Sequence, residues 1–213
     1  MFIVAAVLAG LLVGWVLTRR LATLGYRRPD ETGRATPASR WWLIVATGAA
    51  WGWLVFTLAD QPATVIVMWL PLSAALGWIS AVDLDVQRIP NLTLGPTAIW
   101  VAVCLIALAI TEHPSDPLLH AVIAGAGCFI GFAILHIASP NALGFGDVKL
   151  AAILGAAIGV VSLTAVLAAL LFACILALTW ATATRTTHLA FGPWIAAGAI
   201  LGVGLPALSS ALA

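Results

Sequence analysis

The chain has 213 residues, of which 63% are hydrophobic and only 8% are charged, whereas an ordinary soluble domain is about 25% charged. Nine Lys and Arg and eight Asp and Glu side chains are too few to cover a soluble globule, and the hydrophobic content excludes a disordered chain. A formal net charge of +1 gives no indication of nucleic-acid binding. The composition therefore predicts an integral membrane protein.

Eight apolar segments, separated by polar residues, proline or glycine, follow one another along the chain. They cover residues 2–17, 41–59, 63–81, 92–110, 118–138, 148–160, 162–181 and 191–211. Because a membrane-spanning helix needs about 20 residues, these segments fill the chain. We expect one all-α membrane domain over residues 1–213, a polytopic bundle of about eight transmembrane helices. The sixth and seventh segments nearly join at Gly159, so seven helices are the alternative.

The basic residues predict the orientation of this bundle. If the N-terminus lies outside, eight helices place every Lys and Arg on the inner side, whereas seven helices would place Arg185 outside. The positive-inside rule therefore favours eight helices in the cytoplasmic (inner) membrane, with both termini on the outer side. The longest polar stretch, residues 18–40, is expected to be a loosely ordered cytoplasmic loop, where Asp30 and Glu31 form solvated salt bridges.

Glycines recur in pairs spaced four residues apart in five of the apolar segments. The pairs are Gly10 and Gly14, Gly48 and Gly52, Gly127 and Gly131, Gly155 and Gly159, and Gly198 and Gly202. This spacing allows helix backbones to approach closely in a lipid environment. We interpret the pairs as packing contacts within the chain, with homodimerisation through one of them as the alternative.

Three acidic residues lie near the ends of predicted helices, where ionisable groups are costly and therefore functional candidates. Asp83 and Asp85 occur in AVDLDVQRIPN, and Asp147 occurs in GFGDVKL. The chain crosses the membrane twice between these motifs, so both are expected at the same face. Two nearby carboxyl groups can share a proton, which makes one a base and the other an acid. Aspartic proteolysis requires such a pair.

The surrounding residues leave alternatives open. Gly144 and Gly146 are expected to permit backbone geometry closed to other residues and to leave room for an extended substrate near Asp147. Asp147 could instead cap its helix after an ordinary turn. Asp83 and Asp85 could instead lie in a solvated loop paired with Arg88.

The two motifs resemble those of the type IV prepilin peptidases, which are polytopic aspartic peptidases of the GxGD class. Asp83 is followed seven residues later by Pro90 in IPN, and GFGDVKL spans Gly144 to Leu150. A weaker third similarity is AFGPW at residues 190–194, where Ala190 replaces the usual proline of PFGP. The three matches occur in family order.

The resemblance implies that Asp83 and Asp147 are the catalytic pair, with Gly144, Gly146 and Pro90 as supporting motif residues. Asp85 corresponds to a less strictly acidic position, which implies at most a supporting or electrostatic role. Lys149 would hold the cytoplasmic end of its helix, tune Asp147, or simply anchor the inner face. No metal or other cofactor is implied.

The implied substrates are prepilin-like membrane proteins, cut after a short basic leader at the cytoplasmic face of the lipid bilayer. Many bacterial members also N-methylate the product and carry paired CxxC motifs in the first cytoplasmic loop. The loop at residues 18–40 contains no cysteine, so we expect a peptidase without methylation. The alternatives are another GxGD intramembrane protease or, less in keeping with acids at helix ends, a proton-coupled transporter or channel. The sequence leaves the particular pilin and the oligomeric state open.

Overall fold

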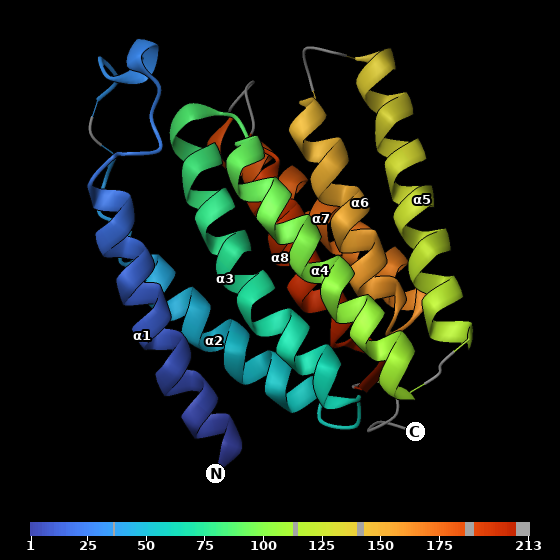
Figure 1. The fold of residues 1–213 in the computed structure, drawn as a ribbon. Helices are drawn as coiled ribbons and strands as arrows, with labels where there is room; N and C mark the ends of the chain where they lie inside the picture. The colour runs from blue at the N-terminus through green and yellow to red at the C-terminus, as the bar shows by residue number, and fades with distance from the viewer. Residues whose placement is uncertain (36, 113–114, 140–142, 186–189, 208–213) are drawn as a thin grey trace.

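The computed structural model describes residues 1–35, 37–112, 115–139, 143–185 and 190–207. Within these residues the secondary structure is helical, without strands. The elements are α1 (Phe2–Ala22), the 3₁₀-helix η1 (Pro29–Glu31), α2 (Trp42–Thr57), α3 (Ala63–Val86), α4 (Asn91–Glu112), α5 (Ser115–Ala138), α6 (Phe145–Gly159), α7 (Leu163–Thr184) and α8 (Gly192–Val203). The predicted all-α fold is confirmed (Figure 1).

Each predicted segment corresponds to one α-helix, although some ends differ. A short break separates α6 from α7, and there the Ser162 hydroxyl accepts a hydrogen bond of 3.2 Å from the Thr164 amide. This N-cap starts α7 as a separate helix. The C-terminal end of α3 lies at Val86, beyond the predicted end at residue 81, so Asp83 and Asp85 belong to a helix rather than a loop.

Five helices of the described residues, α1, α3, α4, α5 and α7, are long and apolar enough to cross a membrane. Their outward faces carry large apolar side chains, such as Leu8, Ile99 and Leu167, each more than 60% exposed. Such faces suit lipid rather than water. The chain is therefore a polytopic membrane helix bundle, while the apolar helices α2 and α8 are shorter.

Glycine contacts join consecutive helices into three tightly packed hairpins, α1–α2, α5–α6 and α7–α8. A Cβ atom on Gly14 would lie 2.6 Å from the Leu43 carbonyl oxygen, and one on Gly159 would lie 2.7 Å from that of His120. One on Gly202 would lie 2.5 Å from the Ala169 amide nitrogen. The absence of a side chain allows these backbones to touch, as predicted.

One glycine pair does not follow this pattern. Cβ atoms on Gly127 and Gly131 of α5 would meet no described atom within 4 Å. This pair makes no close helix contact within the described part of the chain, which corrects the prediction of intramolecular packing at this position.

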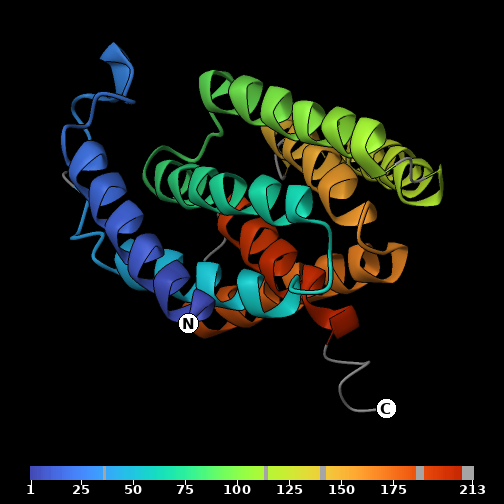
Figure 2. The ribbon, with the colours of Figure 1, turned by 60° about the horizontal axis from the view of Figure 1, so that its bottom comes forward.

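Helix α3 lies at the centre of the arrangement and packs against α1, α2, α4 and α8. Figure 2 shows α8 in the interior, where it also contacts α2, α6 and α7. Both α4 and α8 pack against α3 and against α6. The C-terminal end of α3 and the N-terminal end of α6 therefore lie at the same end of the bundle (Figure 1), together with residues 23–35.

Candidate active site

Asp83 lies in the last turn of α3, and only 4% of its surface is exposed. Its Oδ2 atom accepts a hydrogen bond of 2.9 Å from the backbone N–H of Gly192, the first residue of α8. The unpaired N–H groups and the dipole at a helix N-terminus favour a negative charge there. A Cβ atom at position 192 would lie 2.8 Å from the same oxygen, so this close approach requires glycine.

Asp147 is the third residue of α6 and is 9% exposed. Its Oδ2 atom accepts a hydrogen bond of 3.0 Å from the backbone N–H of Gly144. The N-cap residue is Gly144, and the Asp147 carboxylate bonds its N–H from the third position of the helix, so Asp147 is not itself the N-cap that the alternative predicted. Its Oδ1 atom is buried and has no hydrogen-bond partner among the described residues. Since buried polar atoms are rarely left unpaired, this second oxygen is available for another role.

The structure brings Asp83 and Asp147 into one buried site. Their carboxyl groups are close enough to interact electrostatically, and α4 and α8 connect the two helices that carry them. Like charges at short range disfavour double ionisation, so such a pair can hold one proton between its members. The arrangement can therefore supply one acid and one base to a reacting group.

Gly146, which precedes Asp147, allows the segment before α4 to pack closely against the start of α6. A Cβ atom there would lie 2.9 Å from Cβ of Ile89, the residue before Pro90. The Pro90 carbonyl accepts hydrogen bonds from Thr93 and Leu94 and starts α4. The IPN motif therefore packs directly against the GxGD motif.

The expectation that the motif glycines adopt backbone geometry closed to other residues is wrong, whereas the room they would leave for a substrate stays a prediction. No described glycine has a positive φ, and Gly144 has the ordinary extended values φ −73° and ψ 148°. Because α6 already begins at Phe145, Gly146 is helical. Its requirement is space for Ile89, not unusual backbone geometry.

A family model described as the type IV leader peptidase family matches residues 70–182, more than half of the chain. The chain belongs to this family. The matched region runs from α3 to α7 and contains both Asp83 and Asp147. Comparisons with curated proteins and with solved structures found no match. Family membership and the apolar helices together identify a leader-peptidase-like membrane protease.

Helix α8 lies outside the region matched to the leader peptidase family, yet its Gly192 touches Asp83. The sequence analysis noted AFGPW as a third similarity but assigned no role to Gly192. That motif contains Gly192, so the sequence could have marked this glycine as a candidate site residue. The contact itself joins residues far apart in the chain and could not be read from spacing.

Lys149 of this leader peptidase family member links α6 to the start of α4. Its Nζ atom donates a hydrogen bond of 3.0 Å to Oδ1 of Asn91 and lies 5.1 Å from the centre of the Phe145 ring. Both contacts lead away from Asp147, to the start of α4 and to the first residue of α6. Lys149 therefore holds its helix end against the IPN motif, which is one of the expected roles.

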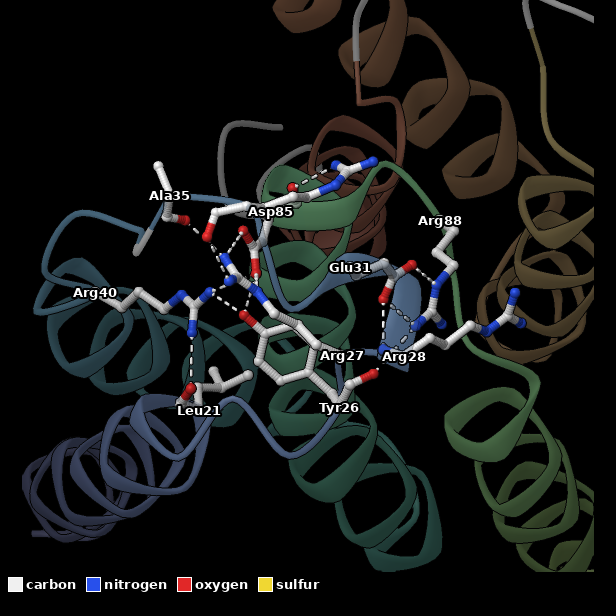
Figure 3. Close-up of polar contacts among 10 residues, drawn as sticks. Leu21, Tyr26, Arg27, Arg28, Glu31, Ala35, Arg40, Asp85 and Arg88 are labelled. Atoms are coloured by element: carbon white, nitrogen blue, oxygen red, sulfur yellow. Dashed lines mark hydrogen bonds and ion pairs between the residues drawn. The ribbon is translucent and has the colours of Figure 1, made fainter.

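Asp85 lies in a polar cluster with Tyr26, Arg27 and Arg40, which we call the Asp85 cluster (Figure 3). Arg27 donates two hydrogen bonds to its carboxylate, from Nη2 at 2.7 Å and from Nε at 2.9 Å. The Tyr26 hydroxyl donates another, and Arg40 lies 3.5 Å away. The Asp85 side chain is 7% exposed, so the alternative of a solvated loop position paired with Arg88 is wrong for Asp85.

Arg88 instead pairs with Glu31 of η1 (Figure 3). Its Nε and Nη2 atoms donate hydrogen bonds of 2.6 and 2.8 Å to the Glu31 carboxylate. These bonds lower the pKa of Glu31 to about 2, and they raise that of Arg88. Glu31 is buried. The first loop is thus fastened to the end of α3, contrary to the prediction of loose order and solvated pairs, because paired charges allow its burial.

Among the residues described, no group of three His, Cys, Asp or Glu side chains could hold a metal ion. Cys104 and Cys128 are buried and Cys174 is exposed. These cysteines occupy core and outward-facing positions.

Proposed function

We propose that this leader peptidase family member is an aspartic endopeptidase that uses Asp83 and Asp147 as its catalytic pair. It removes the short basic leader from type IV prepilin-like precursors, just before their hydrophobic helix. The observation that carries the proposal is the buried pair of carboxyl groups at one end of the bundle, each accepting a backbone N–H.

The pair suits general acid–base hydrolysis of a peptide bond. One ionised carboxylate takes a proton from a water molecule, whose oxygen attacks the scissile carbonyl carbon. The protonated partner gives its proton to the carbonyl oxygen, which yields a gem-diol. The carboxyl group that took the water proton then gives it to the leaving nitrogen as the C–N bond breaks, and one gem-diol hydroxyl returns its proton to the partner carboxylate as the new carboxylic acid forms. The unpartnered Oδ1 of Asp147 is the oxygen that we assign to the water.

We place the site at the cytoplasmic face of the inner membrane, in a bundle of eight spans with both termini outside. All nine basic residues then lie on the inner side, and the positive-inside rule supports this orientation. The loop fastened to α3 by Arg27, Arg40 and Arg88 belongs to that same end of the bundle.

The product is expected to keep a free amino group. Residues 18–40 lack the cysteines that would bind a structural zinc ion, which supports a peptidase without a methyltransferase portion. Mass spectrometry of the mature pilin tests this, because an added methyl group at its N-terminus would contradict it.

The catalytic assignment is tested by coexpression with a prepilin. Asp83→Asn and Asp147→Asn should each abolish cleavage, since an amide can neither accept nor donate the required proton. Asp60→Asn is the matched control, because Asp60 is exposed and lies beside the opposite end of α3. Immunoblots should show equal accumulation of all three variants in the membrane. Full cleavage by either site variant would exclude the pair.

A further inference from the structure

The connection between α3 and α4 joins the helix of Asp83 to the motif that contacts Asp147. Its first residue, Gln87, has a positive φ of 53° and a ψ of 41°. Its N–H bonds to the Asp83 carbonyl oxygen at 2.8 Å. A left-handed conformation is uncommon in a residue other than glycine and persists where the surroundings determine it.

Ion pairs hold the chain on both sides of Gln87. Two residues before it, the Asp85 cluster ties α3 to the first loop, and the Asp85 carbonyl also accepts a hydrogen bond of 3.1 Å from Arg34. Immediately after it, Arg88 pairs with Glu31 and donates to the Tyr26 carbonyl at 3.1 Å. The first loop therefore holds this turn from both sides (Figure 3).

The next residues of the connection touch α6. Ile89 packs against Gly146, and Asn91 accepts the hydrogen bond from Lys149. Gly146 directly precedes Asp147. A continuous series of contacts thus runs from Glu31 through Arg88, Ile89 and Gly146 to Asp147.

Ile89 and Gly146 pack so closely that the turn and the start of α6 have little freedom to move independently. With Cβ of Ile89 only 2.9 Å from where a Cβ on residue 146 would lie, a shift of the turn moves the start of α6. Displacements of about 1 Å can cost an enzyme about a hundredfold in rate. The position of the turn therefore bears directly on how Asp147 faces Asp83.

Resting on the proposed function, we propose that Glu31 and Arg88 are positioning residues for the pair of aspartates. The first loop acts as a brace, because its Glu31 holds Arg88 and Arg88 fixes the turn at residues 87–90. The position of this turn then sets the position of Asp147 relative to Asp83. The Asp85 cluster fixes the other side of the turn. Asp85 thus acts on the site by holding backbone rather than by exchanging protons.

Kinetics of purified protein with a prepilin substrate test this brace. Arg88→Gln and Glu31→Gln should each lower kcat by about tenfold to a hundredfold, with KM changed less than about twofold. Arg88→Lys keeps the charge but loses the bidentate contact, so its kcat should lie between those of wild type and Arg88→Gln. The exchanged pair, Glu31→Arg with Arg88→Glu, should recover kcat above either single Gln variant.

Arg20→Gln is the matched control for removing a cation. Arg20 is exposed at the end of α1 and forms no ion pair with another described residue. Its kcat should equal that of wild type. A loss in this variant equal to that in Arg88→Gln would overturn the brace in favour of a general charge effect.

Hydrogen–deuterium exchange provides a second readout that does not depend on cleavage. In Arg88→Gln, amides of residues 87–92 and 144–148 should exchange faster than in wild type, while those of α7 should not, which shows that the bundle remains folded. Unchanged exchange at residues 144–148, or wild-type kcat in both Gln variants, would overturn the proposal. A wild-type protein that cuts no prepilin would instead refute the proposed function, while the exchange result still decides whether the brace exists.

Discussion

The backbone N–H of Gly192 and the carboxylate of Asp83 meet at 2.9 Å, although 109 positions separate them in the chain. The contact places the N-terminus of α8 against an acid at the end of α3. It also makes the carboxylate dependent on a residue without a side chain, since a Cβ atom at position 192 would lie 2.8 Å from Oδ2.

Gly192→Ala should therefore displace Asp83 and reduce prepilin cleavage by at least about tenfold, since a misplacement of about 1 Å can cost an enzyme about a hundredfold in rate. The cleaved fraction in a coexpression time course measures this loss. Gly127→Ala is the control, because a Cβ atom there meets no described atom within 4 Å. Equal cleavage by the two variants would show that the contact does not matter for activity.

The two motif glycines should differ in their tolerance of a methyl group. Gly146→Ala places a Cβ atom 2.9 Å from that of Ile89, whereas Gly144→Ala brings one to 3.2 Å from Oδ2 of Asp147. A carboxylate oxygen can rotate away, but Cβ of Ile89 is fixed to the backbone. We expect Gly146→Ala to lose most cleavage activity and Gly144→Ala to retain a larger share in the same assay. The reverse order would contradict the spatial role given to Gly146.

Substitutions at Gln87 should report on its left-handed conformation. Glycine adopts this conformation without strain, but it gains more entropy on unfolding. Gln87→Gly is therefore expected to stay within about 1 kcal/mol of wild type. Gln87→Val should be destabilised by about 1–3 kcal/mol, because a β-branched residue is a true outlier at positive φ. Thermal unfolding in detergent measures both, and equal stability of the two variants would argue against a fixed turn.

Acid should release the first loop from α3 through Glu31. Its pKa in the folded protein is lowered to about 2 by Arg88, so the pair stabilises the folded state above the ordinary pKa of about 4.3. That stabilisation is lost as the pH falls from about 4.3 toward about 2. Hydrogen exchange of residues 26–35, corrected for intrinsic rates, should accelerate over this interval. Glu31→Gln should exchange faster already at pH 7 and accelerate less in acid; an identical pH profile would exclude Glu31 as the group responsible.

Much of the architecture could be predicted because lipid imposes simple rules on sequence. Apolar runs of near-spanning length gave the helices, and glycines spaced by four marked the hairpin contacts. The spacing could not distinguish Gly127 and Gly131 from the other pairs. It indicates a helix face without side chains, but it does not show whether another helix packs against that face.

The candidate site was predictable to the level of individual acids but not of their contacts. Asp83 and Asp147 stand out because charge is scarce near predicted helix ends. The partners of Asp85 and Arg88 lie in a polar loop, where composition alone suggests solvent exposure. The burial of these charged side chains depends on ion pairs that Arg27, Arg40 and Glu31 form with residues more than 40 positions away in the chain. A local sequence pattern does not reveal such pairs.

The glycine-packed hairpins also bear on how the protein is made. In each one the first helix synthesised is the longer: α1 has 21 residues against 16 in α2, α5 has 24 against 15 in α6, and α7 has 22 against 12 in α8. A helix of the length needed for independent insertion is thus available before its short partner leaves the ribosome. In two of these hairpins the short helix itself carries closely packed glycines, Gly155 and Gly159 in α6 and Gly198 and Gly202 in α8. Each short helix can therefore pack directly against the long helix that was synthesised before it.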